Sequence, residues 1–360
     1  MKELKGILSE HSKRYPQGNL QDLVKLIYQN EFGSGHFVPD EVAALTRLQD
    51  EIKGIAHASG DLFERIGNGL VRLNLKTLGD VLPAQTVNRF FVLTSNKKWG
   101  SLEGFEANLR ILEEFSSGSD LLPFLEEYKA AGYPPMSHSQ SYRDNYDPHY
   151  RVVSCAFADY FPVFERIEHL LRRQENIVVA IDGRSGSGKS SLGRLLKDVY
   201  GCPVISMDHF FLRPEQRSAS RLSEAGGNVD YERFNLEVVP KLKGGAPFNY
   251  QVFNCQLGTF TASATVEHHR LTVVEGSYSL HPTLIDAYDL KVFLTISPEV
   301  QEERLRKRNG PDMVERFLKE WIPLEERYFS LLDIASKSDL IIDTTELTHQ
   351  EFCSRPSSSS

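Results

Sequence analysis

The sequence predicts an α/β domain with a parallel sheet, preceded by a mainly α-helical domain. In residues 177–343, short apolar runs are separated by stretches of helical pattern, as is typical of a parallel sheet. In residues 4–114, apolar residues recur at spacings of three and four, which indicates amphipathic helices. With 360 residues, of which 40% are hydrophobic, the chain is long enough to bury two cores.

The expected boundary lies near residues 165–176, where a helical pattern ends in a short charged connector at 172–176. We therefore expect a helical domain at residues 1–170 and a nucleotide-binding domain at 171–347. Residues 348–360 end in four serines and are expected to be a disordered tail. The role of residues 1–170 does not follow from their sequence.

Composition excludes several classes of function. The formal net charge of -8 argues against nucleic-acid binding over the general surface. There is no N-terminal signal pattern and no apolar run of membrane-spanning length, so we expect a cytoplasmic protein without membrane contact. The four cysteines lie far apart and form no C-x-x-C pair, which favours reduced thiols over disulfides or zinc.

A phosphate-binding pattern follows the first apolar run of the second half. Residues 177–192 read IVVAIDGRSGSGKSSL, in which 183–190 fit G-x-x-x-x-G-K-S/T. Small residues let consecutive backbone N–H groups face phosphate oxygens, and the helix that follows adds its positive dipole end. A simple strand-to-helix turn is the alternative, but such a turn does not need a Lys-Ser pair. The expected nucleotide-binding residues are Gly183, Ser185, Gly186, Ser187, Gly188, Lys189, Ser190 and Ser191.

Two further apolar runs end in acidic residues. Residues 203–208 end in Asp208 and residues 271–276 contain Glu275. Because the carboxyl ends of parallel strands meet at one edge of the sheet, both acids should lie beside the phosphate loop. We expect Asp208 to accept the proton of a phosphoryl acceptor, or else to cap the next turn. We expect Glu275 and the Ser190 hydroxyl to hold Mg²⁺, unless Glu275 is only a surface acid.

A basic helix follows the run at 290–296 and carries Arg304 and Arg308, which share one face at four-residue spacing. These arginines either belong to a lid that neutralises charge during phosphoryl transfer or form a solvated helix face. Residues 248–253 and 258–262 are expected to form a hairpin outside the central sheet.

One segment of the first half, residues 133–151, is dense in Tyr, His and Arg. Such a segment either contacts a ligand or another subunit, or it packs its aromatic rings against neighbouring helices.

Residues 177–345 resemble the uridine kinase and phosphoribulokinase family of P-loop kinases. The matching pieces are AIDGRSGSGKSSL at 180–192, SMDHFF at 206–211, NVDYERFN at 228–235, VVEGSYSL at 273–280 and RLRKR at 304–308. The resemblance implies that Asp208 is the catalytic base, that Asp230 binds ribose hydroxyls and that Glu275 helps to hold Mg²⁺. Phe211, Tyr231 and Phe253 complete the expected substrate-binding set. The hairpin lacks the histidine that contacts uracil in uridine-binding members, and the segment after Arg308 is short.

These observations predict an ATP- and Mg²⁺-dependent kinase that phosphorylates a hydroxyl of a small molecule, in the first place a nucleoside. A sugar phosphate or a cofactor precursor is an alternative acceptor, for which Arg213, Arg217 and Arg221 could supply charge. The other alternative is a nucleotide-dependent switch or ATPase coupled to residues 1–170. The chain does not contain the N-K-x-D motif of GTPase switches after the phosphate loop, or an LSGGQ-like signature of transporter ATPases, which argues against this alternative. A homo-oligomer is compatible with the sequence.

Overall fold

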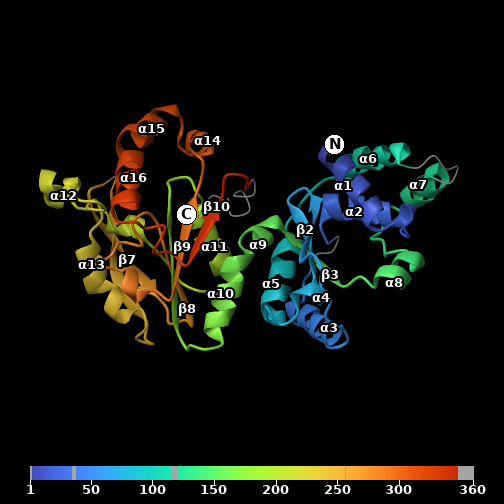
Figure 1. The fold of residues 1–360 in the computed structure, drawn as a ribbon, viewed down its shortest axis with the longest axis horizontal. Helices are drawn as coiled ribbons and strands as arrows, with labels where there is room; N and C mark the ends of the chain where they lie inside the picture. Colours follow the sequence, from blue (N-terminus) through green and yellow to red (C-terminus); the bar gives the residue numbers. More distant parts are fainter. Residues whose placement is uncertain (1, 35–37, 116–120, 256, 348–360) are drawn as a thin grey trace. The chain divides into compact units, whose positions relative to one another are not determined.

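The computed structural model describes residues 2–34, 38–115, 121–255 and 257–347. The chain divides into two compact units, Met1–Asp159 and Tyr160–Ser360 (Figure 1). This boundary lies before the expected position at 170/171, because helix α10 (Phe161–Leu171) packs on strand β9 (Leu290–Thr295) of the second unit. The tail expected at 348–360 lies outside the described residues.

The first unit is largely helical, as predicted, and also contains a three-stranded antiparallel sheet in the order β1-β2-β3. Its helices are α1 (Lys2–Arg14), α2 (Leu20–Phe32), α3 (Glu41–Lys53), α4 (Leu75–Leu78), α5 (Ala84–Ser95), α6 (Leu102–Leu109), the 3-10 helix η1 (Arg110–Glu114), α7 (Leu121–Ala130), α8 (Gln140–Tyr146) and α9 (Cys155–Asp159). Its strands are β1 (Phe63–Gly67), β2 (Leu70–Asn74) and β3 (Tyr150–Ser154).

The hairpin β1-β2 is absent from the sequence prediction, which assigned this region to the helical pattern. Its two-residue turn is Asn68-Gly69, and both residues have positive φ, 49° and 73°. A type I′ turn, with positive φ at both central positions, matches the twist of the flanking strands, and Asn-Gly favours it. The Asn-Gly pair was therefore the available signal for a hairpin.

A buried hydrogen-bond network joins helix α2 to the sheet in the first unit. The His138 ring donates from Nδ1 to Asp22 Oδ1 at 2.8 Å, and its Nε2 accepts from the Tyr150 hydroxyl at 2.7 Å. Gln29 Nε2 donates to the same hydroxyl at 3.2 Å. Gln29 Oε1 in turn accepts from Nε and Nη2 of the buried Arg72 at 3.0 and 2.7 Å. The aromatic segment 133–151 thus supplies two members of this network.

The buried His138 should make the first unit sensitive to acid. Burial lowers the pKa of His138 from 6.5 to about 4. Between these values the unfolded chain binds a proton that the folded chain does not. Folding stability should therefore fall as the pH drops from about 6.5 to about 4, by up to about 3 kcal/mol.

Replacing His138 by Gln removes the titrating group and keeps a hydrogen-bonding side chain. Urea denaturation midpoints measured from about pH 8 down to about pH 4.5 should fall more steeply for the wild type than for His138→Gln. Parallel curves would contradict the prediction.

The second unit contains the predicted parallel sheet, with five strands in the order β10-β9-β4-β8-β5. The strands are β4 (Ile177–Gly183), β5 (Val204–Ser206), β8 (Leu271–Glu275), β9 and β10 (Leu340–Asp343), and every neighbouring pair is parallel. The first strand in sequence, β4, lies in the centre of the sheet. Its neighbours β8 and β9 come later in the chain and lie on either side of it, and ligands of open α/β sheets bind at the carboxyl ends of strands where the strand order reverses in this way.

Helices cover both faces of this sheet (Figure 1). The helices of the second unit are α10, α11 (Lys189–Tyr200), α12 (Ala219–Ser223), α13 (Tyr231–Glu237), α14 (Pro298–Asn309), α15 (Pro311–Arg316), the π-helix η6 (Phe317–Trp321) and α16 (Ile322–Leu331). Short 3-10 helices are η2 (Met207–Phe210), η3 (Pro214–Gln216), η4 (Val239–Lys241) and η5 (Ile285–Ala287). Alternate residues of β4, Val178 and Ala180, join one core with Phe210, Phe234 and Tyr328.

The predicted hairpin is confirmed as a separate two-stranded sheet of β6 (Phe248–Asn254) and β7 (Thr259–Val266). Among the helices of the described ranges, none combines the length and apolar character needed to cross a bilayer.

Candidate active site

The phosphate loop connects β4 to α11 at the centre of the sheet. Gly183 ends β4, with φ of 142°, and pairs with Leu294 of β9 so closely that a Cβ atom would lie 2.1 Å from the Leu294 carbonyl oxygen. Gly186 and Gly188 also have positive φ, 78° and 98°. The glycines therefore adopt backbone conformations that would be strained for a residue with a side chain. They direct the chain into the helix at Lys189.

Lys189 and the serines of the loop occupy distinct positions. The Lys189 ammonium donates to the carbonyls of Gly183 and Arg184 at 2.7 and 3.0 Å, so it lies across the entrance of the loop. Ser187 is fully buried, and its hydroxyl has no hydrogen-bond partner among the described residues. Ser191 lies in the first turn of α11.

Glu275 and Ser190 come together as predicted, at the carboxyl end of β8. The Ser190 hydroxyl donates to Glu275 Oε2 at 2.9 Å, and Glu275 is only 6% exposed. Burial raises the pKa of Glu275, and the charge of Asp208 adds to this effect. A divalent cation would relieve the repulsion between the two carboxylates, and their oxygen atoms are the donors that Mg²⁺ prefers.

No group of three or more His, Cys, Asp or Glu side chains in the described ranges forms a metal cage. Mg²⁺ in phosphoryl-transfer sites commonly takes only one or two protein ligands besides phosphate oxygens, so the Ser190–Glu275 pair fits this ion.

Asp208 lies beside Glu275 at the same edge of the sheet. Strand β5 ends at Ser206, which pairs with Glu275, and Asp208 follows in η2. It is the Ser206 hydroxyl that accepts from the Asp208 N–H, at 3.4 Å, so the Asp208 side chain is not the helix cap. Asp208 is exposed, and its charge contributes to raising the pKa of Cys255, which burial raises most. The charge of Asp208 thus acts both on Glu275 and on the hairpin turn.

Asp182 is a site residue that the sequence analysis did not identify. Its fully buried carboxylate accepts from the N–H groups of Gly183, Tyr278 and Leu280 at 2.7, 3.2 and 2.9 Å, and from the Tyr328 hydroxyl at 2.8 Å. Burial raises the pKa of Asp182 to about 6, against the opposing effect of these donors. The side chain fixes the phosphate loop to the loop after β8. Like Asp208 and Glu275, Asp182 ends an apolar run, and this pattern could have identified it as a candidate site residue from the sequence.

The expected substrate-binding residues surround η2 and α13. Asp230 is 2% exposed and caps α13, where Oδ1 accepts from the Arg233 N–H at 3.0 Å and Oδ2 accepts from Gln216 Nε2 at 2.9 Å. A substrate hydroxyl would have to displace Gln216 to reach this carboxylate. Its neighbour Tyr231 stacks on His281 with ring centroids 4.3 Å apart.

The two phenylalanines of the expected set lie on either side of this region. Phe211 pairs with Val229 in an isolated β-bridge. Phe253 is 2% exposed and packs on Phe260 in the hairpin, which places it in the hairpin core.

The two arginines of α14 differ in their surroundings. Arg304 donates from Nη2 to the carbonyls of Thr344 and Leu347 at 2.6 and 2.8 Å, and from Nη1 towards the Gly186 carbonyl at 3.5 Å. Arg308 is exposed, and its guanidinium lies 5.9 Å from the centre of the Phe317 ring. Arg304 thus ties the loop after β10 to the phosphate loop, whereas Arg308 keeps its charge at the surface.

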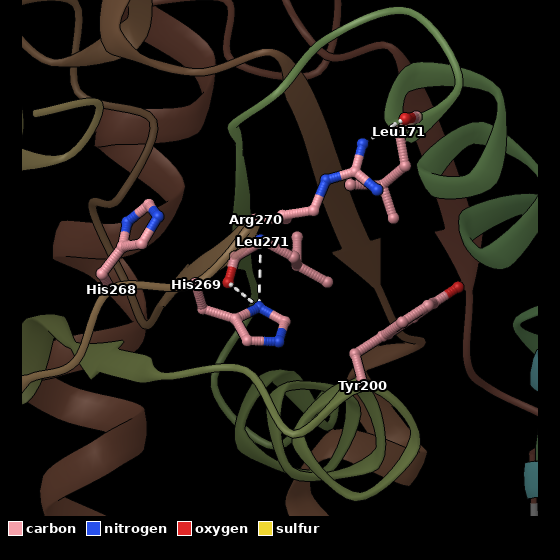
Figure 2. A pocket seen from close by; sticks show the side chains of 6 residues that line it. All are labelled: Leu171, Tyr200, His268, His269, Arg270 and Leu271. Atoms are coloured by element: carbon pink, nitrogen blue, oxygen red, sulfur yellow. Dashed lines mark hydrogen bonds between the residues drawn. The ribbon is translucent and has the colours of Figure 1, made fainter. Parts of the chain in front are cut away.

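A hollow of about 390 Å³ lies at the opposite end of the sheet from the phosphate loop (Figure 2). It is lined by Leu171, Tyr200, His268, His269, Arg270 and Leu271. Leu271 begins β8, whereas Glu275 ends it, so this hollow is separate from the predicted site. Within it, His269 Nδ1 accepts from the Leu271 N–H at 3.1 Å.

The chain matches no family model. It is 28% identical over 145 residues to the phosphoribulokinase of Synechocystis sp., a match that covers 39% of this chain and 43% of that protein. It is 26% identical over 183 residues to the cytidylate kinase of Pyrobaculum arsenaticum, covering 48% of this chain and 86% of that protein. A solved structure of a possible uridine kinase from Bacillus stearothermophilus is 18% identical, with a TM-score of 0.38, and the match covers 51% of this chain and all of that one.

The chain thus spans less than half the length of the phosphoribulokinase that it matches. The phosphate loop after the central strand and the five parallel strands lie in the second unit. About half of the chain is therefore similar in sequence to phosphoribulokinase and cytidylate kinase, the second unit is a parallel α/β sheet with a phosphate loop after its central strand, and the first unit is unassigned.

Proposed function

We propose that the second unit is an ATP-dependent, Mg²⁺-requiring kinase that transfers the γ-phosphoryl group to a hydroxyl of a small molecule, in the first place a nucleoside. The observation that carries this proposal is the arrangement of Ser190, Glu275 and Asp208 at one edge of the sheet, beside the phosphate loop. This arrangement combines a triphosphate cradle, a pair of metal ligands and a free carboxylate. A switch protein would need no such carboxylate next to the transferring phosphate.

On the donor side, the loop amides and Lys189 bind the triphosphate. Nucleotide binding draws the Lys189 ammonium from the Gly183 and Arg184 carbonyls to the β- and γ-phosphates. Ser190 and Glu275 would hold Mg²⁺, which supplies charge neutralisation at the phosphate oxygens when bound. Arg308, on the exposed end of α14, adds positive charge during transfer, and Arg304 holds the loop in place.

On the acceptor side, Asp208 orients the hydroxyl and takes its proton as the bond to phosphorus forms. Among the described residues, none donates a hydrogen bond to this carboxylate, so it is free to accept one from substrate. Asp230 binds further hydroxyls once Gln216 moves aside. Catalysis then depends mostly on positioning and electrostatics.

A phosphorylated acceptor is the second candidate, because the charge of Arg217, like that of Asp208, reaches the hairpin turn. The charges of both residues act on the Cys255 thiol, with opposite signs. Arg221 is less suited to this role, since it is paired with both carboxylate oxygens of Glu232 at 2.6 and 2.7 Å and bound to the Gly227 and Val229 carbonyls. One of the relatives is named a cytidylate kinase and another a phosphoribulokinase, and such acceptors belong in the test.

The test is ADP release from ATP and Mg²⁺ across a panel of nucleosides, nucleoside monophosphates, sugar phosphates and vitamin alcohols. Stimulation by one acceptor, together with its phosphorylated product, would establish the kinase and the class of its substrate. ADP release that no acceptor stimulates would reject the kinase and favour the switch.

Glu275→Gln should raise the Mg²⁺ concentration needed for half-maximal activity by roughly tenfold or more, because a neutral amide binds this cation poorly. The side chain keeps its shape and can still accept from Ser190. Activity measured against Mg²⁺ concentration checks this, with Glu315→Gln, an exposed acid paired with Lys319, as the control. An unchanged Mg²⁺ requirement would remove Glu275 from the metal site.

A further inference from the structure

Helix α16 contacts the phosphate loop through the buried side chain of Glu325. The Ser185 N–H donates to Glu325 Oε2 at 2.8 Å, and the Ser185 hydroxyl donates to Oε1 at 2.7 Å. The Ser277 hydroxyl, in the loop after β8, donates to the same Oε1 at 2.7 Å. Glu325 is 4% exposed, so three donors meet one carboxylate away from water. Such charge-assisted bonds are about twice as strong as neutral ones.

A second contact fixes the register of α16. Tyr328, three residues after Glu325 and on the same side of the helix, donates its hydroxyl to Asp182 Oδ2 at 2.8 Å. Asp182 lies in β4 directly before the phosphate loop. The helix is therefore bound to the strand, to the phosphate loop and to the loop after β8.

Ser185 is also bound by helix α14, which precedes α16 in the chain. Gln301 of α14 donates from Nε2 to the Ser185 carbonyl at 2.8 Å. The backbone N–H, the backbone carbonyl and the hydroxyl of Ser185 are thus all bound by α14 or α16. Between these helices lie α15 and the π-helix, which carry Arg316 and Trp321, and Arg308 lies near the end of α14. A displacement of Ser185 must therefore act on both ends of segment 302–324.

We propose that Glu325 is a positioning residue that couples the phosphate loop to segment 302–324. Nucleotide binding rearranges the loop at Ser185, and the shared carboxylate passes this change to α16 and to the π-helix that precedes it. The coupling brings the charge of Arg308 towards the transferring phosphate. This inference rests on the proposed function, because it requires that the loop binds a nucleotide.

The two tryptophans of the chain allow a direct test. Trp321 lies in the π-helix, with its ring 4.4 Å from that of Phe317, whereas Trp99 lies in the first unit. In a Trp99→Phe background, the fluorescence of Trp321 reports on the segment alone. MgADP is the probe, and its binding is measured separately by titration calorimetry.

MgADP should change the Trp321 emission in the Trp99→Phe chain, and Glu325→Ala should abolish most of this change while MgADP still binds within about tenfold of the original affinity. Glu325→Gln should recover the response, because its amide oxygen can accept from the Ser185 N–H and its NH₂ can donate to the hydroxyls. Asp286→Asn, which changes an exposed acid in η5 outside segment 302–324, is the control. Turnover should follow the same order, with Glu325→Gln close to the Trp99→Phe chain and Glu325→Ala well below it. The loss should appear mainly as a lower kcat, with a smaller change in KM.

Ser185→Ala is a milder variant in case Glu325→Ala does not fold, as judged by circular dichroism. It removes one of the three donors, and it should reduce the Trp321 response without abolishing it. A full response in Glu325→Ala or Ser185→Ala, with MgADP bound, would overturn the coupling and leave the proposed function intact. Failure of the Trp99→Phe chain to bind MgADP would instead reject the proposed function, and the coupling with it.

Discussion

Asp208→Asn is expected to lower the rate of acceptor-stimulated ADP formation by roughly 100- to 10,000-fold, the usual contribution of a general base. The amide keeps the shape of the side chain, and the backbone N–H of residue 208 can still donate to the Ser206 hydroxyl. It cannot accept a proton at neutral pH, so the acceptor hydroxyl is no longer activated. Because Asp208 is exposed and no described residue donates to its carboxylate, the substitution should leave the stability of the fold nearly unchanged.

The loss should appear in kcat, whereas the affinity for MgADP should change little, since Asp208 lies on the acceptor side of the metal. Steady-state kinetics with the acceptor identified by the panel, together with calorimetric titration of MgADP, measure the two quantities. Asp286→Asn changes an exposed acid in η5 of the same unit and is the matched control. Turnover of Asp208→Asn at the rate of the control would exclude Asp208 as the base.

Gly183→Ala is expected to have the largest effect on the fold and to abolish nucleotide binding with it. The new Cβ would lie 2.1 Å from the carbonyl oxygen of Leu294 and 2.8 Å from its backbone nitrogen, both of which are fixed by strand pairing. Strand β9 would have to move away from β4, which breaks the hydrogen bond from the Arg184 N–H to the same carbonyl, 3.1 Å long. Overpacking of this kind costs about 3 kcal/mol or more, to which the positive φ adds strain.

Gly201→Ala separates these two causes. Gly201 ends α11 with φ of 70°, and no atom lies within 4 Å of the position that its Cβ would take. The Gly201→Ala substitution should therefore lower the free energy of unfolding only by the backbone strain, about 1 kcal/mol. Scanning calorimetry and MgADP titration of both variants compare the effects. Equal losses of thermal stability would show that the contact with Leu294 does not matter.

The rule that acidic residues end parallel strands at one edge of the sheet places Asp208 and Glu275 near each other, and in the structure Ser206, two residues before Asp208, pairs with Glu275. Their meeting follows from local sequence, because a parallel sheet brings the carboxyl ends of its strands to one edge. The same rule applies to Asp182, whose carboxylate is instead fully buried and bound by three backbone N–H groups and a tyrosine hydroxyl. Position at a strand end does not decide whether a side chain points to solvent or into the loops.

In the first unit, periodicity predicted the helices and missed the sheet. Strand β2 is buried on both sides, so its residues Leu70, Val71 and Leu73 show no alternation of apolar and polar types. The partner strand β3 follows more than seventy residues later, and its pairing depends on the fold. Local pattern carries little information about a short, fully buried strand.

The sequence by itself determined the P-loop, its place between a strand and a helix, the hairpin and the division into a helical and an α/β part. These features depend on residues close together in the chain, where spacing and turn chemistry suffice. Only the tertiary structure decided that Glu325 binds Ser185 and Ser277, from 140 and 48 residues away, and that Asp230 caps a helix. Side-chain partners so distant in sequence are chosen by packing, which no local pattern records.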